Sequence, residues 1–168
     1  MQLDNFTAEL GLIPSGPAGI AETLRVMRRL AREGKTDIQV RTIAARTVQG
    51  CDQKDFACEV ASVHAFVRDE IRYLLDVDGV ETVQAPRVTL QMRAGDCDDK
   101  STLLAAMLLA IGHPCRFVAI GFQPQIYEHV YVETKIGERW IPLETTEPVE
   151  VGWQPNPRAV QARMNFWI

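Results

Sequence analysis

Apolar residues recur at the spacing of an α-helix through most of the first half of the chain. Three segments carry this pattern, and we expect helices over residues 20–33, 37–50 and 54–71. Asp37 is placed to cap the second helix, and Gly34 and Gly50 end the first two. The Gly/Pro-rich residues 11–19 are too interrupted for a helix and predict a loop. The first half is therefore predicted to be helical.

The pattern changes after residue 75. Residues 76–95 contain Gly79, Pro86 and Gly95, and they predict a loop with a short helical turn at 88–92. The strongly apolar segment 98–110 predicts a helix. Strand-like runs follow at 116–122, 126–134 and 139–143, and Gly137 indicates a hairpin turn between the last two. The fold class is thus α+β, with helices followed by an antiparallel sheet.

Composition adds the class of protein and its size. With 168 residues, 46% hydrophobic and 24% charged, the chain matches one ordinary globular domain. We expect a helical part at 18–75, a core at 76–146 and an extended tail at 147–168 whose aromatic residues dock on the domain.

Charge and hydropathy exclude several partners. A net charge of -4 predicts no nucleic-acid or anionic membrane partner. The arginines of the first helix are best interpreted as a solvated face. No run approaches the roughly 18 apolar residues that cross a bilayer, and the start does not resemble a signal peptide. The sequence therefore predicts a cytoplasmic protein.

Four cysteines are present, and their spacing argues against a metal site. Cys51, Cys58, Cys97 and Cys115 form no CxxC pair and lie at no histidine-ligand spacing, so we expect neither zinc nor another cofactor. In a reducing compartment all four are expected to be free thiols. Cys58 and Cys115 are interpreted as small buried residues. The role of Cys51, in a Gly-Cys-Asp loop, stays open.

The segment before the apolar helix places a cysteine at a helix start. Asp96 is suited to cap this helix, with Asp99 reaching back in a capping-box-like arrangement, which puts Cys97 in the first turn. There the helix dipole favours a thiolate, and the backbone N–H can donate to an oxyanion. Gly95 would let the loop pass close to a substrate. The neighbouring aspartates oppose a thiolate, so an active Cys97 needs a cationic partner.

His129 and Glu144 are the candidates that complete this site. His129 lies in the predicted strand 126–134, and Glu144 follows the strand 139–143, so the hairpin can bring them together. A carboxylate there would fix the tautomer of His129 and stabilise its charged form. Gln84 is a candidate second oxyanion donor. Each residue alone also has an ordinary explanation, as a structural cysteine, a satisfied histidine, a surface acid or a loop amide.

Three segments together resemble the transglutaminase-like superfamily: AGDCDDKSTLLAAMLLAIG at 94–112, EHVYVE at 128–133 and WIPLETT at 140–146. The resemblance implies a papain-like α+β core with the cysteine helix packed on an antiparallel sheet. Position by position, it implies Cys97 as nucleophile, His129 as base and Glu144 as acid. The superfamily usually has aspartate at the last position. The helical segments before these resemble phage or prophage-encoded members, which implies that virion association is an alternative to a free cytoplasmic protein.

The function that these residues predict is acyl transfer from an amide or peptide bond. Water as acceptor makes the chain a cysteine protease or amidase acting on a protein or peptide, which we expect. An amine acceptor makes it a transglutaminase. A third interpretation is a catalytically silent phage structural or assembly module with the same fold.

Overall fold

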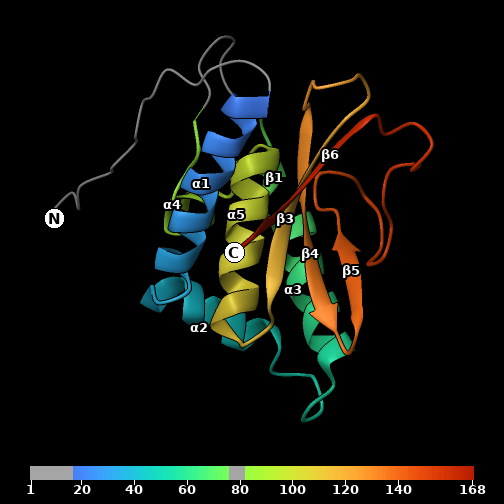
Figure 1. Cartoon of the computed structure of the whole chain (residues 1–168). Coiled ribbons are helices and arrows are strands. Elements are labelled where there is room, and N and C mark those ends of the chain that lie inside the picture. The colour runs from blue at the N-terminus through green and yellow to red at the C-terminus, as the bar shows by residue number, and fades with distance from the viewer. Residues whose placement is uncertain (1–16, 76–81) are drawn as a thin grey trace, which may run out of the picture.

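Five helices and six strands make up the part of the chain that the computed structural model describes, residues 17–75 and 82–168 (Figure 1). The α+β class is confirmed. In chain order the elements are α1 (Pro17–Gly34), α2 (Ile38–Thr47), α3 (Phe56–Glu70), β1 (Arg72–Tyr73), α4 (Pro86–Met92), β2 (Ala94–Gly95), α5 (Cys97–Ala110), β3 (Cys115–Gly121), β4 (His129–Ile136), β5 (Arg139–Leu143) and β6 (Ala162–Trp167).

Local signals place most helix ends near the predicted positions. Asp37 caps α2, since its carboxylate accepts from the backbone N–H groups of Gln39 at 2.8 Å and Val40 at 3.1 Å. The loop predicted at 11–19 extends too far, because α1 already begins at Pro17, and proline suits the first helical position. Residues 11–16 of that prediction lie outside the described residues.

The main sheet has four antiparallel strands in the order β5-β4-β3-β6. The predicted hairpin is confirmed, with β5 at the predicted bounds and Gly137 in the turn at a φ of +59°. The tail contributes more than expected, because β6 pairs with β3 along its whole length. In the loop predicted at 76–95, the expected helical turn at 88–92 is present and starts earlier, as α4. The loop also holds the strand β2, which pairs in parallel with β1; residues 76–81 lie outside the described part.

The helix α5 lies at the centre, between α1 and the main sheet (Figure 1). Its residues from Asp98 to Leu108 are all buried, polar ones included, so the helix is covered on every side. The start of α5, the start of β4 and the end of β5 lie at the same end of the molecule (Figure 1). Among the described helices, none combines the length and apolar character that would let it cross a membrane.

The cysteine assignments need one correction. Cys51 and Cys58 form a disulfide, with their Cα atoms 5.7 Å apart, so the prediction of four free thiols is wrong. Asp55 caps α3 and accepts from the Cys58 backbone N–H at 3.0 Å, which places Cys58 in the first turn, facing the α2–α3 connection. Because disulfides are rare in reducing compartments, this pair gives no support to a cytoplasmic location. Cys115 is a free buried thiol, as predicted.

Candidate active site

The first turn of α5 is built by a cap that the sequence predicted. Asp96 accepts from the backbone N–H groups of Asp98 at 3.0 Å and Asp99 at 3.1 Å, and Cys97 is the first helical residue. Asp99 also accepts two hydrogen bonds from Gln84. A Cβ atom on Gly95 would lie 2.5 Å from Asp99 Cβ, so Gly95 leaves room for that side chain. Gly95 was expected to let the loop approach a substrate closely. In the structure, the side chain that approaches Gly95 closely is that of Asp99.

The surroundings of Cys97 favour a neutral thiol. Burial raises the pKa of Cys97, and the carboxylates of Asp98 and Asp96 raise it further. The Cys97 Sγ lies 3.5 Å from Asp98 Oδ1, as donor of a weak hydrogen bond. A backbone hydrogen bond from Val130 acts in the opposite direction and stabilises the thiolate. Burial and the two aspartates outweigh the hydrogen bond from Val130, so Cys97 depends on a base for activation.

The histidine and the acid lie in direct contact. His129 Nε2 is 2.5 Å from Glu144 Oε2, and Glu144 is only 1% exposed. Glu144 Oε1 accepts from the backbone N–H of Thr146 at 2.6 Å and from its hydroxyl at 2.7 Å. Burial raises the pKa of Glu144, but the hydrogen bonds from His129 and Thr146 outweigh it and hold the pKa below its usual value. Glu144 is therefore a carboxylate, which makes His129 Nε2 the donor and leaves Nδ1 as the basic nitrogen.

Cys97 is linked to the His129–Glu144 pair by Val130, the residue that follows His129 in β4. Val130 follows His129 directly, and its backbone N–H bonds the Cys97 sulfur. One turn further along α5, the Ser101 hydroxyl donates to the Val130 carbonyl at 3.2 Å. These two contacts join the first turns of α5 to the start of β4. Within residues 17–75 and 82–168, the hydrogen bonds bring His129 to Glu144 and Cys97 to Val130, with none directly between Cys97 and His129.

Gln84 lies against the same helical turn, with its amide engaged elsewhere. Its Nε2 donates to Asp99 Oδ2 at 2.6 Å, and its backbone N–H donates to Asp99 Oδ1 at 2.7 Å. Its Oε1 is buried and finds no hydrogen-bond partner within the described residues. As an oxyanion donor, Gln84 has only the second hydrogen of its amide group to offer.

Sequence reasoning missed two residues that support Glu144. His64 Nε2 lies 2.5 Å from the Glu144 backbone carbonyl, although the two residues are 80 positions apart. His64 stands alone in the middle of a helix, and no local pattern separates it from an ordinary buried histidine. Thr146 carries a weak signal, since a hydroxyl two residues after an acid can bond back to it.

Tyr73 is a third residue near the site. The short ladder between β1 and β2 aligns Tyr73 with Gly95, two residues before Cys97. Burial raises the pKa of the Tyr73 phenol, and the carboxylates of Asp96 and Asp98 raise it further. Tyr73 is 42% exposed. A partly exposed aromatic ring therefore lies beside the loop that leads to the nucleophile.

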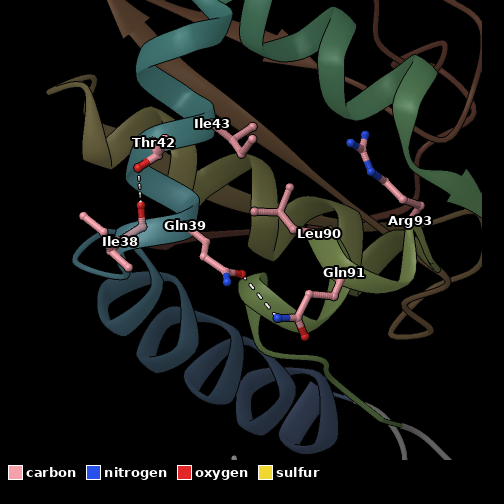
Figure 2. A pocket seen from close by; sticks show the side chains of 7 residues that line it. All are labelled: Ile38, Gln39, Thr42, Ile43, Leu90, Gln91 and Arg93. Atoms are coloured by element: carbon pink, nitrogen blue, oxygen red, sulfur yellow. Dashed lines mark hydrogen bonds between the residues drawn. The ribbon is translucent and has the colours of Figure 1, made fainter. Parts of the chain in front are cut away.

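A separate pocket opens between α2 and α4 (Figure 2). Ile43 and Leu90 line it together with Ile38, whose side chain is largely exposed, and Gln39 bonds Gln91 across it at 3.2 Å. It includes none of the candidate catalytic residues, so it is not the active site.

Known proteins share the family and the fold of this chain. The family model of the transglutaminase-like superfamily matches residues 41–145. A crystal structure described as a "putative cysteine protease" from Cytophaga hutchinsonii is similar, with a TM-score of 0.55, 18% identity, and coverage of 75% of this chain and 42% of that chain. The crystal structure of a "putative protease" from Parabacteroides distasonis is also similar, with a TM-score of 0.61 and 17% identity. The match covers 79% of this chain and 27% of that chain.

These matches define the fold and the family. The chain spans less than half the length of either solved protein. Comparison with curated proteins finds no significant match. The resemblance to phage-encoded members stays a prediction. The family match covers more than half of the chain and contains Cys97, His129 and Glu144, and the chain belongs to the transglutaminase-like superfamily.

Proposed function

We propose that this chain transfers an acyl group from an amide or peptide bond to water, with Cys97 as nucleophile, His129 as base and Glu144 as the acid that orients the histidine. One observation carries the proposal: the Glu144 carboxylate holds His129 Nε2 at the start of β4, next to the strand residue that bonds the Cys97 sulfur. A Cys-His-acid set in this order is the arrangement that thiol acyl transfer requires.

Because the pKa of Cys97 is raised, the proton leaves as the sulfur attacks. His129 Nδ1 takes the thiol proton while Sγ bonds the carbonyl carbon, and Glu144 stabilises the imidazolium that forms. The backbone N–H of Cys97, at a helix position without an intrahelical partner, is placed to stabilise the oxyanion. We propose Gln84 as a second donor.

Collapse of the tetrahedral intermediate completes the first half of the reaction. The carbon–nitrogen bond breaks, the leaving amine takes the proton from His129, and a thioester remains on Cys97. Water then attacks the thioester, His129 accepts a proton from that water, and the carboxylic acid leaves with the thiol restored. The proposed substrate is a protein or peptide.

Two alternatives share the same site. An amine acceptor in place of water makes the chain a transglutaminase. A chain that keeps the fold without turnover is a structural or assembly module, and the resemblance to phage-encoded members would associate such a module with virions. Both solved proteins of similar fold are described as a "putative" protease, which favours hydrolysis. We also propose that residues 1–168 act as one domain, because one hydrophobic cluster draws residues from α1 through β5, with Phe166 of the tail packed against it.

The test is mass spectrometry of the chain after incubation with a peptide library, with and without a primary amine. We expect cleavage products and a thioester on Cys97, both absent in Cys97→Ala and His129→Ala. Amine-coupled products in place of cleavage would assign the transglutaminase alternative. Equal products from wild type and Cys97→Ala, or none from either, would refute the enzyme proposal.

A further inference from the structure

His64 occupies a position that its helix would otherwise give to an apolar residue. The other buried side chains of α3 are Val60, Val63 and Val67. His64 is 1% exposed, and its Nε2 lies 2.5 Å from the backbone carbonyl of Glu144. A carbonyl oxygen only accepts, so His64 Nε2 carries a proton and donates it. A buried polar side chain on this face therefore makes a contact that valine could not make.

The carbonyl that His64 holds lies just beyond the sheet. The ladder between β4 and β5 ends at the pair Val132–Leu143, so the strand pairing stops one residue before Glu144. From there His64 anchors the Glu144 backbone, and Thr146 binds one side-chain oxygen. The other oxygen receives His129 Nε2. The direction of the Glu144 side chain thus depends on contacts outside the sheet, one of which comes from α3.

The charge on His64 is also controlled by its surroundings. Burial lowers the pKa of His64 and the nearby Arg68 lowers it further, whereas the Glu144 carbonyl and the carboxylates of Glu150 and Glu144 raise it. The net effect keeps His64 neutral at pH 7, with its one proton on the nitrogen that faces Glu144. The donor is therefore present throughout the neutral range.

We infer that His64 is a positioning residue of the active site, which fixes the Glu144 backbone so that the carboxylate meets His129. This inference rests on the proposed function, because its effect on reaction rate passes through Glu144 and His129 to Cys97. The chain of contacts runs from α3 to the end of β5 and on to the start of β4. His64 itself does not contact a reacting atom.

The test compares three variants of His64 with one matched control. His64→Leu removes the donor and keeps the bulk, His64→Gln retains a donor of similar reach, and His64→Asn has a donor that is too short. His113→Leu is the control, because His113 is also a buried histidine, 5% exposed, with Nε2 2.7 Å from Glu59 Oε2. His113 follows the C-terminal end of α5, about 20 Å from Cys97 by the rise of the helix.

Two measurements are made on each variant. The first is the tautomer of His129, read from imidazole ¹⁵N shifts and assigned by comparison with His129→Ala. The second is the alkylation rate of Cys97 from pH 5 to 9. In His64→Leu and His64→Asn we expect a mixture of His129 tautomers and a rate reduced about two- to tenfold at neutral pH, the range that one hydrogen bond is worth. His64→Gln should restore both measurements, and His113→Leu should lower the melting temperature without moving either.

Unchanged His129 tautomer and Cys97 rate in His64→Leu would overturn the inference, as would a change of equal size in His113→Leu. If His64→Leu does not fold, the comparison between His64→Asn and His64→Gln tests the inference. The same His129 tautomer and the same Cys97 alkylation rate in both variants would refute the need for a donor within reach of Glu144. Failure of the proposed function looks different, since Cys97 would then react alike in wild type and His129→Ala. The His129 tautomer would still report the contact with His64.

Discussion

The carboxylate of Asp98 accepts a weak hydrogen bond from the proposed nucleophile, and replacing it should make Cys97 more acidic. Asp98 Oδ1 lies 3.5 Å from Cys97 Sγ, and its charge is, after burial, the largest cause that raises the pKa of Cys97. Asp98→Asn keeps the shape of the side chain and removes the charge. The pKa of Cys97 should therefore fall.

The size of the effect follows from the separation of the two groups. Two unit charges about 4 Å apart repel by about 1 kcal/mol in water and about 4 kcal/mol near a protein surface. At about 1.4 kcal/mol for each pKa unit, the pKa of Cys97 should fall by about one to three units. A thiolate also loses nucleophilicity as its pKa falls, so alkylation at pH 7.4 should accelerate about three- to fortyfold.

The measurement is the rate of Cys97 carbamidomethylation by iodoacetamide from pH 6 to 11, followed by peptide mass spectrometry. Asp55→Asn is the matched control, because it makes the same substitution at the start of another helix, α3. Asp55 is not among the groups that shift the pKa of Cys97. Asp98→Asn also removes an acid from the first turn of α5, which should cost about 0.3–1 kcal/mol of stability.

An unchanged or higher pKa for Cys97 in Asp98→Asn would refute this reasoning. Such a result would mean that burial alone controls the thiol. An equal shift in Asp55→Asn would show that the change in net charge, and not the neighbouring carboxylate, moves the pKa.

Three further predictions concern the acid, the buried face of α5 and a second thiol. Glu144→Gln should fold but slow peptide turnover about 10²- to 10⁴-fold, with Glu144→Asp retaining part of the rate; unchanged turnover would assign the third group elsewhere. Leu104→Ala should lower the free energy of unfolding, measured in urea, by about 2–5 kcal/mol, because Leu104 is fully buried. Cys97→Ala should leave the free energy of unfolding close to the wild-type value. A large loss of stability in Cys97→Ala would favour a structural cysteine. Burial raises the pKa of Cys115 to about 12, so the folded state keeps the thiol proton at pH values where the unfolded state, with a pKa of about 8.5, releases it. The free energy of unfolding should therefore decrease from about pH 8.5 toward pH 12. Cys115→Ala should reduce this decrease; an unchanged decrease would assign it to another group.

The parts of the fold that the sequence predicts are those with local causes. Asp37 and Asp96 cap helices through amides two and three residues away, and both caps appear where they were expected. The β4–β5 hairpin is likewise local, which is why the contact between His129 and Glu144 could be anticipated.

The parts that sequence reasoning missed depend on residues far apart or on weak local patterns. β6 is a strand because β3 offers it a free edge more than 40 residues earlier. Its own residues 162–166 do alternate between apolar and polar side chains, but this local pattern is too short to predict a strand by itself. His64 contacts Glu144 across 80 residues. Cys51 and Cys58 pair only because the α2–α3 connection turns back on itself, which their spacing alone does not reveal.

The place of β6 in the sheet bears on how the chain folds as it is synthesised. β3, β4 and β5 form a continuous meander, and among the described strands it is β6, residues 162–167, that covers the second edge of β3. At about 5–20 residues per second, the ribosome needs about one to five seconds to extend the chain from the end of β5 to the end of β6. During that interval β3 presents unpaired backbone groups beside apolar side chains, a surface that pairs readily with other chains. The nascent protein is therefore most exposed to aggregation after its proposed catalytic residues have all been made and before β6 pairs with β3.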